Sequence, residues 1–218
     1  MRSETFATPD NIDDKTSRWL SEIYRYVRPR GDLALRPDKC ALLVVDMLRY
    51  FADPGGRVYL PSTRAVIPAI GKLLHHWRDR GGTVVFTQHC HQGPEDLGML
   101  GKFFGDYIRC GEEDSKIIEE LSPVEGERVF RKNTYDAFYG TGLEEYLESR
   151  SAEQVLITGV LTQMCCETTA RSAFVRGFEV HVAADALTTS SERLHLDSLL
   201  GMATCCAVIT RSSRILEN

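Results

Sequence analysis

The chain has 218 residues, of which 43% are hydrophobic and 26% are charged, so it is long enough to form one sizeable globular domain. Its formal net charge of −5 and the lack of a basic run argue against nucleic acid as a main partner. No apolar run approaches the roughly 20 residues of a membrane-spanning helix, and the opening residues lack the apolar region of a secretory signal.

An extension over residues 1–38 precedes the main domain, which we place at residues 39–218. Within the extension, residues 17–27 have apolar positions at helical spacing, which predicts a helix that packs on the domain or on a neighbouring subunit. Strands and helices then alternate. The predicted strands cover residues 41–45, 83–87, 128–130, 154–158, 178–183 and 207–209, and the predicted helices cover 63–80, 115–121, 142–148, 168–176 and 191–204.

This alternation of apolar strands with helices predicts an α/β fold. We expect three layers, α/β/α, around a mostly parallel, Rossmann-like sheet of about six strands. The segment 89–112 is rich in glycine and aromatic residues, and we expect it to be an active-site loop.

The cysteines give a second expectation about the chain. Seven are present, and they include the adjacent pairs Cys165-Cys166 and Cys205-Cys206. This spacing matches neither a disulfide framework nor a zinc site. We therefore expect free thiols and a cytoplasmic location.

Four chemically distinctive side chains stand at or just after predicted strands: Asp46, His89, Lys132 and Cys165. Ligands of parallel sheets bind beyond the carboxyl ends of the strands, so we expect these side chains to share one site. Asp46 is interpreted as a general base, with a helix N-cap as the alternative. Lys132 alone would suggest a surface charge. Cys165 stands where a strand gives way to a helix, and there the helix dipole favours a thiolate.

The segment after the fourth predicted strand carries a family resemblance. It reads Gly159-Val160-Leu161-Thr162-Gln163-Met164-Cys165-Cys166-Glu167-Thr168-Thr169-Ala170-Arg171, and Arg176-Gly177-Phe178 closes the following helix. This pattern resembles the nucleophile motif of the isochorismatase-like cysteine hydrolases, which include nicotinamidases, N-carbamoylsarcosine amidohydrolases and ureidoacrylate amidohydrolases. The resemblance runs from about Cys40 to Ile209.

The resemblance implies a catalytic triad of Asp46, Lys132 and Cys165. Cys165 follows Gly159 at the family's spacing for the nucleophile, and Cys166 is then expected to be buried packing. The Lys132 ammonium is expected to stabilise the thiolate and to keep Asp46 ionised.

The resemblance also implies a cis peptide bond between Val160 and Leu161, and an oxyanion hole made by the backbone amides of Leu161 and Cys165. We expect the substrate pocket to be lined by aromatic and histidine side chains. These are Phe51, His89, Phe103, Phe104, Tyr135 and Phe138.

His89 and His91 form a His-x-His pattern that is compatible with a metal site. Nicotinamidases have Asp-x-His at this point, and a metal site needs at least three protein ligands. Because the sequence offers no convincing third ligand, we interpret both residues as loop histidines near the pocket and expect neither a metal nor another cofactor.

Three functions remain open from the sequence. The preferred one is a cysteine amidohydrolase that cleaves a C–N bond of a small amide, ureido or carbamoyl compound through a thioester. The second is an isochorismatase-type vinyl-ether hydrolase that uses Asp46 and Lys132, although true isochorismatases have glycine at the position of Cys165 and an arginine near Leu97. The third is a non-catalytic family member.

We also expect a homodimer or a homotetramer that acts on a small-molecule substrate. Residues 17–27 and 97–107 would expose more apolar surface than one small domain readily covers, and such patches usually mark interfaces.

Overall fold

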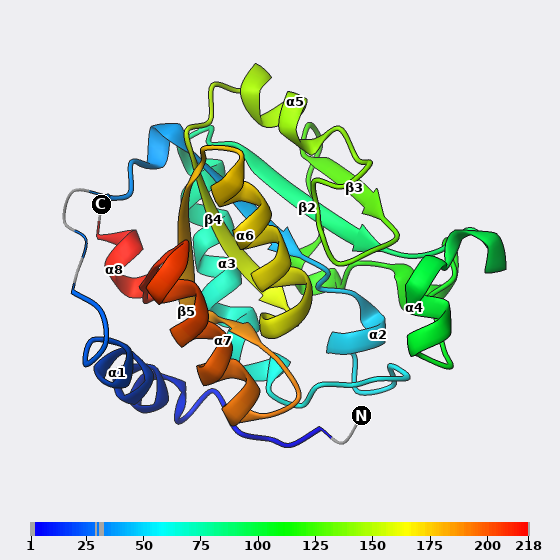
Figure 1. Cartoon of the computed structure of the whole chain (residues 1–218), viewed down its shortest axis with the longest axis horizontal. Helices are drawn as coiled ribbons and strands as arrows, with labels where there is room; N and C mark the ends of the chain where they lie inside the picture. The colour runs from blue at the N-terminus through cyan, green and yellow to red at the C-terminus, as the bar shows by residue number, and fades with distance from the viewer. Residues whose placement is uncertain (1–2, 29, 31–32, 218) are drawn as a thin grey trace.

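The structure is a computed structural model that describes residues 3–28, 30 and 33–217. These residues form one six-stranded sheet in the order β3-β2-β1-β4-β5-β6, in which every pair of neighbours is parallel (Figure 1). The strands are β1 (Cys40–Val45), β2 (Val84–His89), β3 (Arg128–Lys132), β4 (Gln154–Val160), β5 (Glu179–Thr188) and β6 (Val208–Thr210). The predicted α/β class and the predicted parallel sheet are confirmed.

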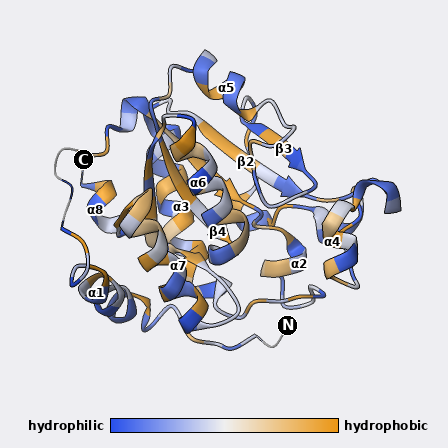
Figure 2. Ribbon diagram, in the orientation of Figure 1, coloured by the Kyte–Doolittle hydropathy of each residue, from blue (hydrophilic) through white to orange (hydrophobic). Residues whose placement is uncertain are grey.

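Helices cover both faces of this sheet. On one face, α3 (Thr63–Asp79) and α8 (Ser212–Leu216) pack against the strands and against each other. On the other face lie α5 (Leu143–Ser149), α6 (Glu167–Val175) and α7 (Glu192–Cys205). Two apolar clusters fill the spaces between the layers, and Figure 2 shows the central strands as mostly hydrophobic. Strands β1 and β4 are buried along their whole length, because helices cover them on both sides.

The N-terminal helix α1 (Ile12–Ile23) begins and ends earlier than the predicted 17–27. It packs on α7 and β5 of the same chain, and its buried side chains include Trp19, Leu20 and Ile23. The apolar face of α1 is therefore already used within one chain.

The segment predicted to be a helix over 115–121 is not one. It contains two short 3-10 turns, Glu113–Ser115 and Glu119–Leu121, separated by extended backbone. The reason is a backbone contact with the segment after β1: Ile118 N donates to the Met47 carbonyl at 3.0 Å, and Ile117 pairs with Leu48 as an isolated bridge. Because this pairing requires extended backbone, it prevents a continuous helix.

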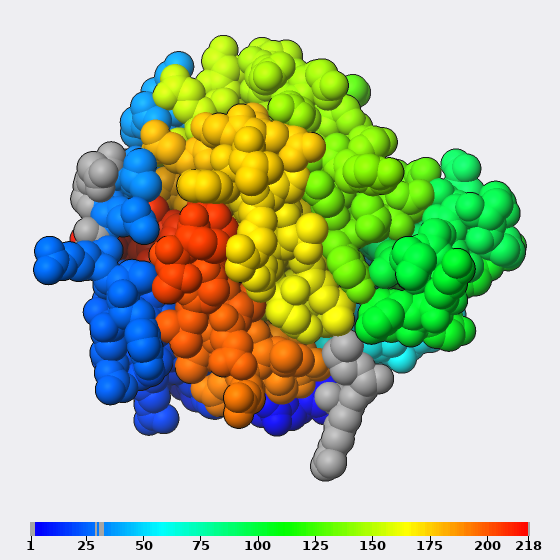
Figure 3. All heavy atoms as spheres, viewed as in Figure 1, coloured from blue at the N-terminus to red at the C-terminus, as the bar shows by residue number. Residues whose placement is uncertain are grey.

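The loop after β2 contains the 3-10 turn Pro94–Asp96 and one short α-helix, α4 (Gly98–Phe103), none of whose residues is buried. Its segment projects from the body of the molecule (Figure 3). A disulfide joins Cys90 to Cys110 at the base of this projection.

The disulfide contradicts the expectation of free thiols throughout. Its two cysteines meet because the chain returns to the end of β2, where His91 N donates to the Ile108 carbonyl at 2.8 Å and Cys110 N donates to the His91 carbonyl at 2.9 Å. This long-range return is invisible in cysteine spacing. It also removes the cysteine-based argument for a reducing compartment.

Two further short helices, α2 (Arg49–Ala52) and the 3-10 turn Pro37–Lys39, flank β1. None of the helices in the described part of the chain is long and apolar enough to span a membrane.

Candidate active site

The carboxyl ends of four neighbouring strands bring the predicted site residues together. Asp46 follows β1, and His89 and Lys132 are paired neighbours at the ends of β2 and β3. Val45 of β1 pairs with Gly159 of β4, so the loop that carries Cys165 starts beside Asp46. The topology predicted for the sheet therefore produces one site at one edge.

Gly159 is required for this close approach of β1 and β4. Its φ is +107°, and a Cβ atom there would lie 2.0 Å from the Val45 carbonyl oxygen. Any other residue would push β4, and the loop that follows it, away from Asp46.

Asp46 is completely buried, and its backbone has a φ of +49°, a region that non-glycine residues seldom adopt. Its Oδ1 accepts hydrogen bonds from Thr87 Oγ1 at 2.7 Å and from His89 N at 3.1 Å. Its Oδ2 lies 2.7 Å from Lys132 Nζ. Burial would raise the pKa of Asp46, but Lys132 and the hydrogen-bond donors outweigh it and lower that pKa, so the carboxylate is ionised at neutral pH.

The Lys132 side chain is also fully buried, and its ammonium is surrounded by acceptors. Besides Asp46, Nζ contacts Thr134 O at 3.0 Å, Cys165 Sγ at 3.2 Å and His89 Nδ1 at 3.4 Å. Burial lowers the pKa of Lys132, whereas Asp46 and Cys165 raise it by more, so the ammonium stays charged. Lys132 is thus not the surface charge that a lone lysine would suggest.

The charge state of Cys165 differs from the sequence-based expectation of a thiolate. Burial and the neighbouring Asp46 raise the pKa of Cys165 to about 12, although Lys132 lowers it. Cys165 is only 5% exposed, so its thiolate would lose most of its hydration. This effect raises the pKa by more than the nearby Lys132 ammonium lowers it. At rest, Cys165 is therefore a thiol beside a carboxylate.

Residues 161–166, which we call the nucleophile loop, connect β4 to α6. The peptide bond between Val160 and Leu161 is cis, as the resemblance implied. The residues Thr162–Cys166 form a single π-helical turn. Cys166 has no exposed surface and packs in the core between the sheet and α6, which agrees with its predicted packing role.

The two histidines form a hydrogen-bonded pair. His91 Nδ1 lies 2.9 Å from the Asp96 carbonyl, which can only accept, so this nitrogen carries a proton. His91 Nε2 lies 3.2 Å from His89 Nε2. The other ring nitrogen of His89, Nδ1, lies 3.3 Å from the Thr134 carbonyl and 3.4 Å from Lys132 Nζ, so either tautomer of His89 has a partner there. Burial and Lys132 lower the pKa of His89 to about 4, which keeps its ring neutral.

Asp46, His89 and Cys165 are, within the described part of the chain, the one group of metal-ligand side chains with donor atoms within 4.8 Å of one another. However, Lys132 Nζ lies within hydrogen-bonding distance of all three residues. A divalent ion there would meet this buried ammonium, and like charges in a buried site repel strongly. These residues therefore do not fit a metal ion.

A cavity of about 290 Å³ opens above Cys165. Its walls come from α2, the ends of β2, the α4 segment and the nucleophile loop. The residues that line it are Tyr50, Phe51, Val58, His89, His91, Leu100, Phe104, Gly105, Asp106, Tyr107, Ile108, Tyr135, Leu161, Met164 and Cys165. The cavity is mostly apolar and aromatic, and the polar side chains among its described lining residues are a cysteine, two histidines, one aspartate and three tyrosines.

Comparisons with known proteins agree with this geometry. Residues 40–214 match the model of the isochorismatase domain. The chain belongs to the isochorismatase-like family of hydrolases. It is 39% identical over 166 residues to "Nicotinamidase 3" of Arabidopsis thaliana, an overlap that covers 75% of this chain and 80% of that protein.

Solved structures of this family superpose on the chain. A cysteine hydrolase from Pseudomonas syringae pv. phaseolicola 1448A gives a TM-score of 0.81 at 26% identity, covering 84% of this chain and 93% of that one. N-carbamoylsarcosine amidase from Thermoplasma acidophilum gives 0.71 at 28% identity, covering 80% and 96%. The fold, the hydrolase class and membership of the cysteine-hydrolase group follow from these matches.

Two residues predicted to line the pocket of this family member do not line it. Phe103 points into solvent with 79% of its surface exposed, because α4 turns Met99 and Phe103 outward and presents Leu100 to the cavity. Phe138 is buried in the apolar cluster that α5 and α6 form on the sheet, where it stacks on Phe178 with ring centroids 5.9 Å apart. Phe51, His89, Phe104 and Tyr135 do line the cavity.

Sequence analysis missed several wall residues, among them Tyr50, Tyr107 and Met164. Tyr107 lies in the segment 89–112, which was predicted to be an active-site loop. The sequence predicted the loop but not which of its side chains face the cavity. Tyr50 and Phe51 both line the cavity, and nothing local indicates that two adjacent residues of α2 would do so.

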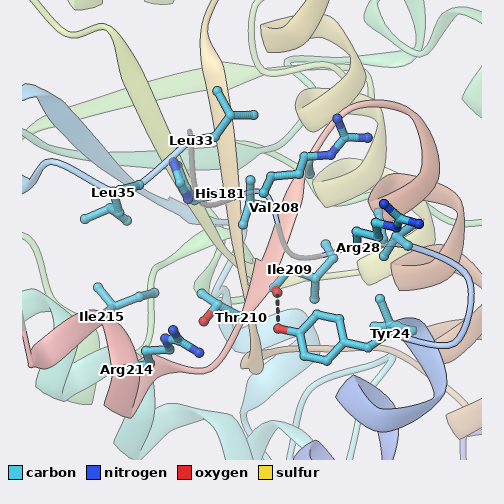
Figure 4. Close-up of a pocket in the computed structure, with 16 residues that line it drawn as sticks. Tyr24, Arg28, Leu33, Leu35, His181, Val208, Ile209, Thr210, Arg214 and Ile215 are labelled. Carbon is cyan, nitrogen blue, oxygen red and sulfur yellow. Dashed lines mark hydrogen bonds between the residues drawn. The ribbon is translucent and has the colours of Figure 1, made fainter.

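A second cavity of about 310 Å³ lies far from these strand ends, between the segment after α1 and strand β6 (Figure 4). His181, Thr210 and Arg214 are among the residues around it. Its described lining residues include no cysteine and no carboxylate, so it lacks the groups that hydrolysis at a thiol requires.

Proposed function

We propose that this protein is a cysteine amidohydrolase that cleaves a C–N bond of a small, uncharged, planar amide, ureido or carbamoyl compound. The observation that carries the proposal is the contact of Cys165 Sγ with the buried Lys132–Asp46 pair at the floor of an aromatic cavity. A buried, ionised carboxylate next to a protonated thiol is a general base in position.

The geometry suggests which oxygen takes the proton. Asp46 Oδ1 already accepts hydrogen bonds from Thr87 and from His89 N, whereas Oδ2 faces the Lys132 ammonium at 2.7 Å. A carboxylate oxygen has two lone pairs, so Oδ2 can still accept a proton. As Sγ attacks the substrate carbonyl carbon, the thiol proton passes to Asp46, and the thiolate is formed only during attack.

The remaining steps conserve atoms and charge. The carbonyl oxygen becomes an oxyanion, which the backbone amides of Leu161 and Cys165 stabilise. Asp46 returns the proton to the leaving nitrogen, the C–N bond breaks, and ammonia or an amine leaves behind a thioester. Asp46 then deprotonates a water molecule that attacks the thioester, which gives a carboxylic acid and restores the thiol. Lys132 stays protonated throughout and keeps Asp46 ionised at the start of each cycle.

The cavity walls support an uncharged substrate. None of its described lining residues is a lysine or an arginine. Asp106, the one carboxylate in the wall, accepts hydrogen bonds from Tyr50 at 2.9 Å and from Arg57 at 2.7 Å, so its charge is compensated. A dicarboxylate such as isochorismate would be desolvated there without a cationic partner, which disfavours the vinyl-ether alternative. The name of the nicotinamidase relative makes nicotinamide the first compound to test.

The test is release of ammonia from a panel of nicotinamide, ureido and carbamoyl compounds, run beside release of pyruvate from isochorismate. We expect ammonia from at least one amide and a mass shift of the protein for an acyl group trapped on Cys165. Cys165→Ala should abolish this activity, and the matched control Cys166→Ala should retain most of it. Release of pyruvate without ammonia would favour the vinyl-ether reaction. Release of neither product would favour a non-catalytic protein.

A further inference from the structure

Behind the nucleophile loop lies a buried histidine that does not line the cavity. His195 is in the first turns of α7 and has no exposed surface. Its Nδ1 lies 2.9 Å from Thr162 Oγ1, and burial lowers the pKa of His195 to about 4, so the ring is neutral. Either the hydroxyl donates to Nδ1 or the Nδ1 proton is donated to the hydroxyl, and both tautomers give one buried hydrogen bond.

The same helix holds Thr162 at a second point. Ser198, about one turn after His195, lies with Oγ 3.2 Å from the Thr162 carbonyl and 2.6 Å from Glu167 Oε2, at the start of α6. Helix α7 therefore binds both the side chain and the backbone of Thr162. Thr162 directly follows Leu161, so its position determines where the loop leaves β4.

The far side of the His195 ring is fixed by the N-terminal segment. Trp19 of α1 meets it edge-on with ring centroids 4.5 Å apart, and Phe6 lies 5.7 Å away. Both aromatic residues are anchored in turn: Trp19 Nε1 donates to Glu192 at 2.9 Å, and Phe6 N donates to Ser62 Oγ at 3.0 Å. The imidazole is thus clamped between the N-terminal segment and the nucleophile loop.

We propose that His195 is a positioning residue for hydrolysis, which acts through Thr162 to keep the amide of Leu161 and the thiol of Cys165 aligned with the substrate carbonyl. The inference rests on the proposed function, because it assigns a role in that same reaction. His195 touches neither the cavity nor the triad, so its effect is on geometry alone. A displacement of about 1 Å at a reacting centre reduces turnover by as much as 100-fold, so the loop has little tolerance for movement.

The experiment compares His195→Phe, which keeps the aromatic packing but loses the hydrogen bond, with Thr162→Val, which removes the other partner. For each we expect kcat to fall by about tenfold or more with KM changed by less than about twofold, since substrate binding is left intact. The kcat of the double variant should be no lower than that of the slower single variant, because both substitutions remove the same hydrogen bond. His195→Asn, which can still donate to or accept from the Thr162 hydroxyl, should recover part of kcat.

The matched control is His181→Asn. His181 is another buried histidine with a pKa lowered to about 4, but it lies on β5 beside the second cavity (Figure 4). Its replacement should leave kcat unchanged even if it lowers the melting temperature. A folded His195→Phe or Thr162→Val variant with wild-type kcat would overturn the inference, as would single effects that multiply in the double variant. Lack of turnover by the wild-type protein would instead refute the proposed function itself.

Discussion

Replacing Lys132 by methionine tests the buried ion pair most directly. The change keeps most of the side-chain volume but removes the ammonium, while the Asp46 carboxylate stays fully buried. Removing one partner of a buried pair costs about 3 to 5 kcal/mol, because the other charge is left unpaired. For a chain of this size, about 2 to 4 °C per kcal/mol gives a fall in melting temperature on the order of 10 °C.

The loss of stability in Lys132→Met should depend on pH in one direction. In the wild-type protein the folded pKa of Asp46 is below its unfolded value, so the pair stabilises the fold above about pH 4 and this contribution is lost on further acidification. In Lys132→Met, burial without the ammonium raises the folded pKa of Asp46, so the destabilisation is greatest at neutral pH. The difference in unfolding free energy between the two proteins should therefore narrow as the pH falls from about 7.5 towards about 4.

Urea unfolding at several pH values provides the measurement. The double variant Asp46→Asn/Lys132→Met should recover most of the lost stability at neutral pH, since neither charge remains, although it stays inactive. Lys116→Met, which removes an exposed ion pair with Glu113, is the control and should leave the unfolding midpoint almost unchanged. If Lys132→Met were as stable as the wild-type protein, or if the double variant were no more stable than the single one, the buried-pair argument would be wrong.

Three further predictions follow from the same structure. Cys110→Ser should lower the stability by about 3 kcal/mol under non-reducing conditions, because the Cys90–Cys110 disulfide spans 20 residues, and a wild-type protein insensitive to reductant would contradict this. Exhaustive chelation should leave activity intact, because the buried Lys132 ammonium contacts each of Asp46, His89 and Cys165, the one group of three metal-ligand side chains among the described residues; loss of activity with rescue by a divalent metal would refute that argument. Light scattering should give a mass of two or four chains, and a mass near 24.5 kDa would rule out the predicted homo-oligomer.

Some features of this protein were determined by the sequence alone. Apolar runs predicted the central strands β1, β2 and β4 to within a few residues, because apolarity is a local property and a strand buried on both faces needs no other signal. The positions of Asp46, Lys132 and Cys165 at or just after strand ends were equally local, and parallel pairing alone then brings such residues to one edge. The glycine of the nucleophile segment was visible as well, although its clash distance to Val45 was not.

Other features depended on tertiary structure. The protonation state of Cys165 is set by desolvation, which exists only once helices and strands close over the thiol. The Cys90–Cys110 disulfide and the extended segment at Ile117 arise from chain returns over many residues, and no local pattern encodes where a loop returns. The same is true of Phe103 and of His195. Phe103 was predicted to line the pocket, but the packing of α4 turns its ring into solvent. No prediction was made from the sequence for His195, which the packing of α1 and α7 places behind the nucleophile loop.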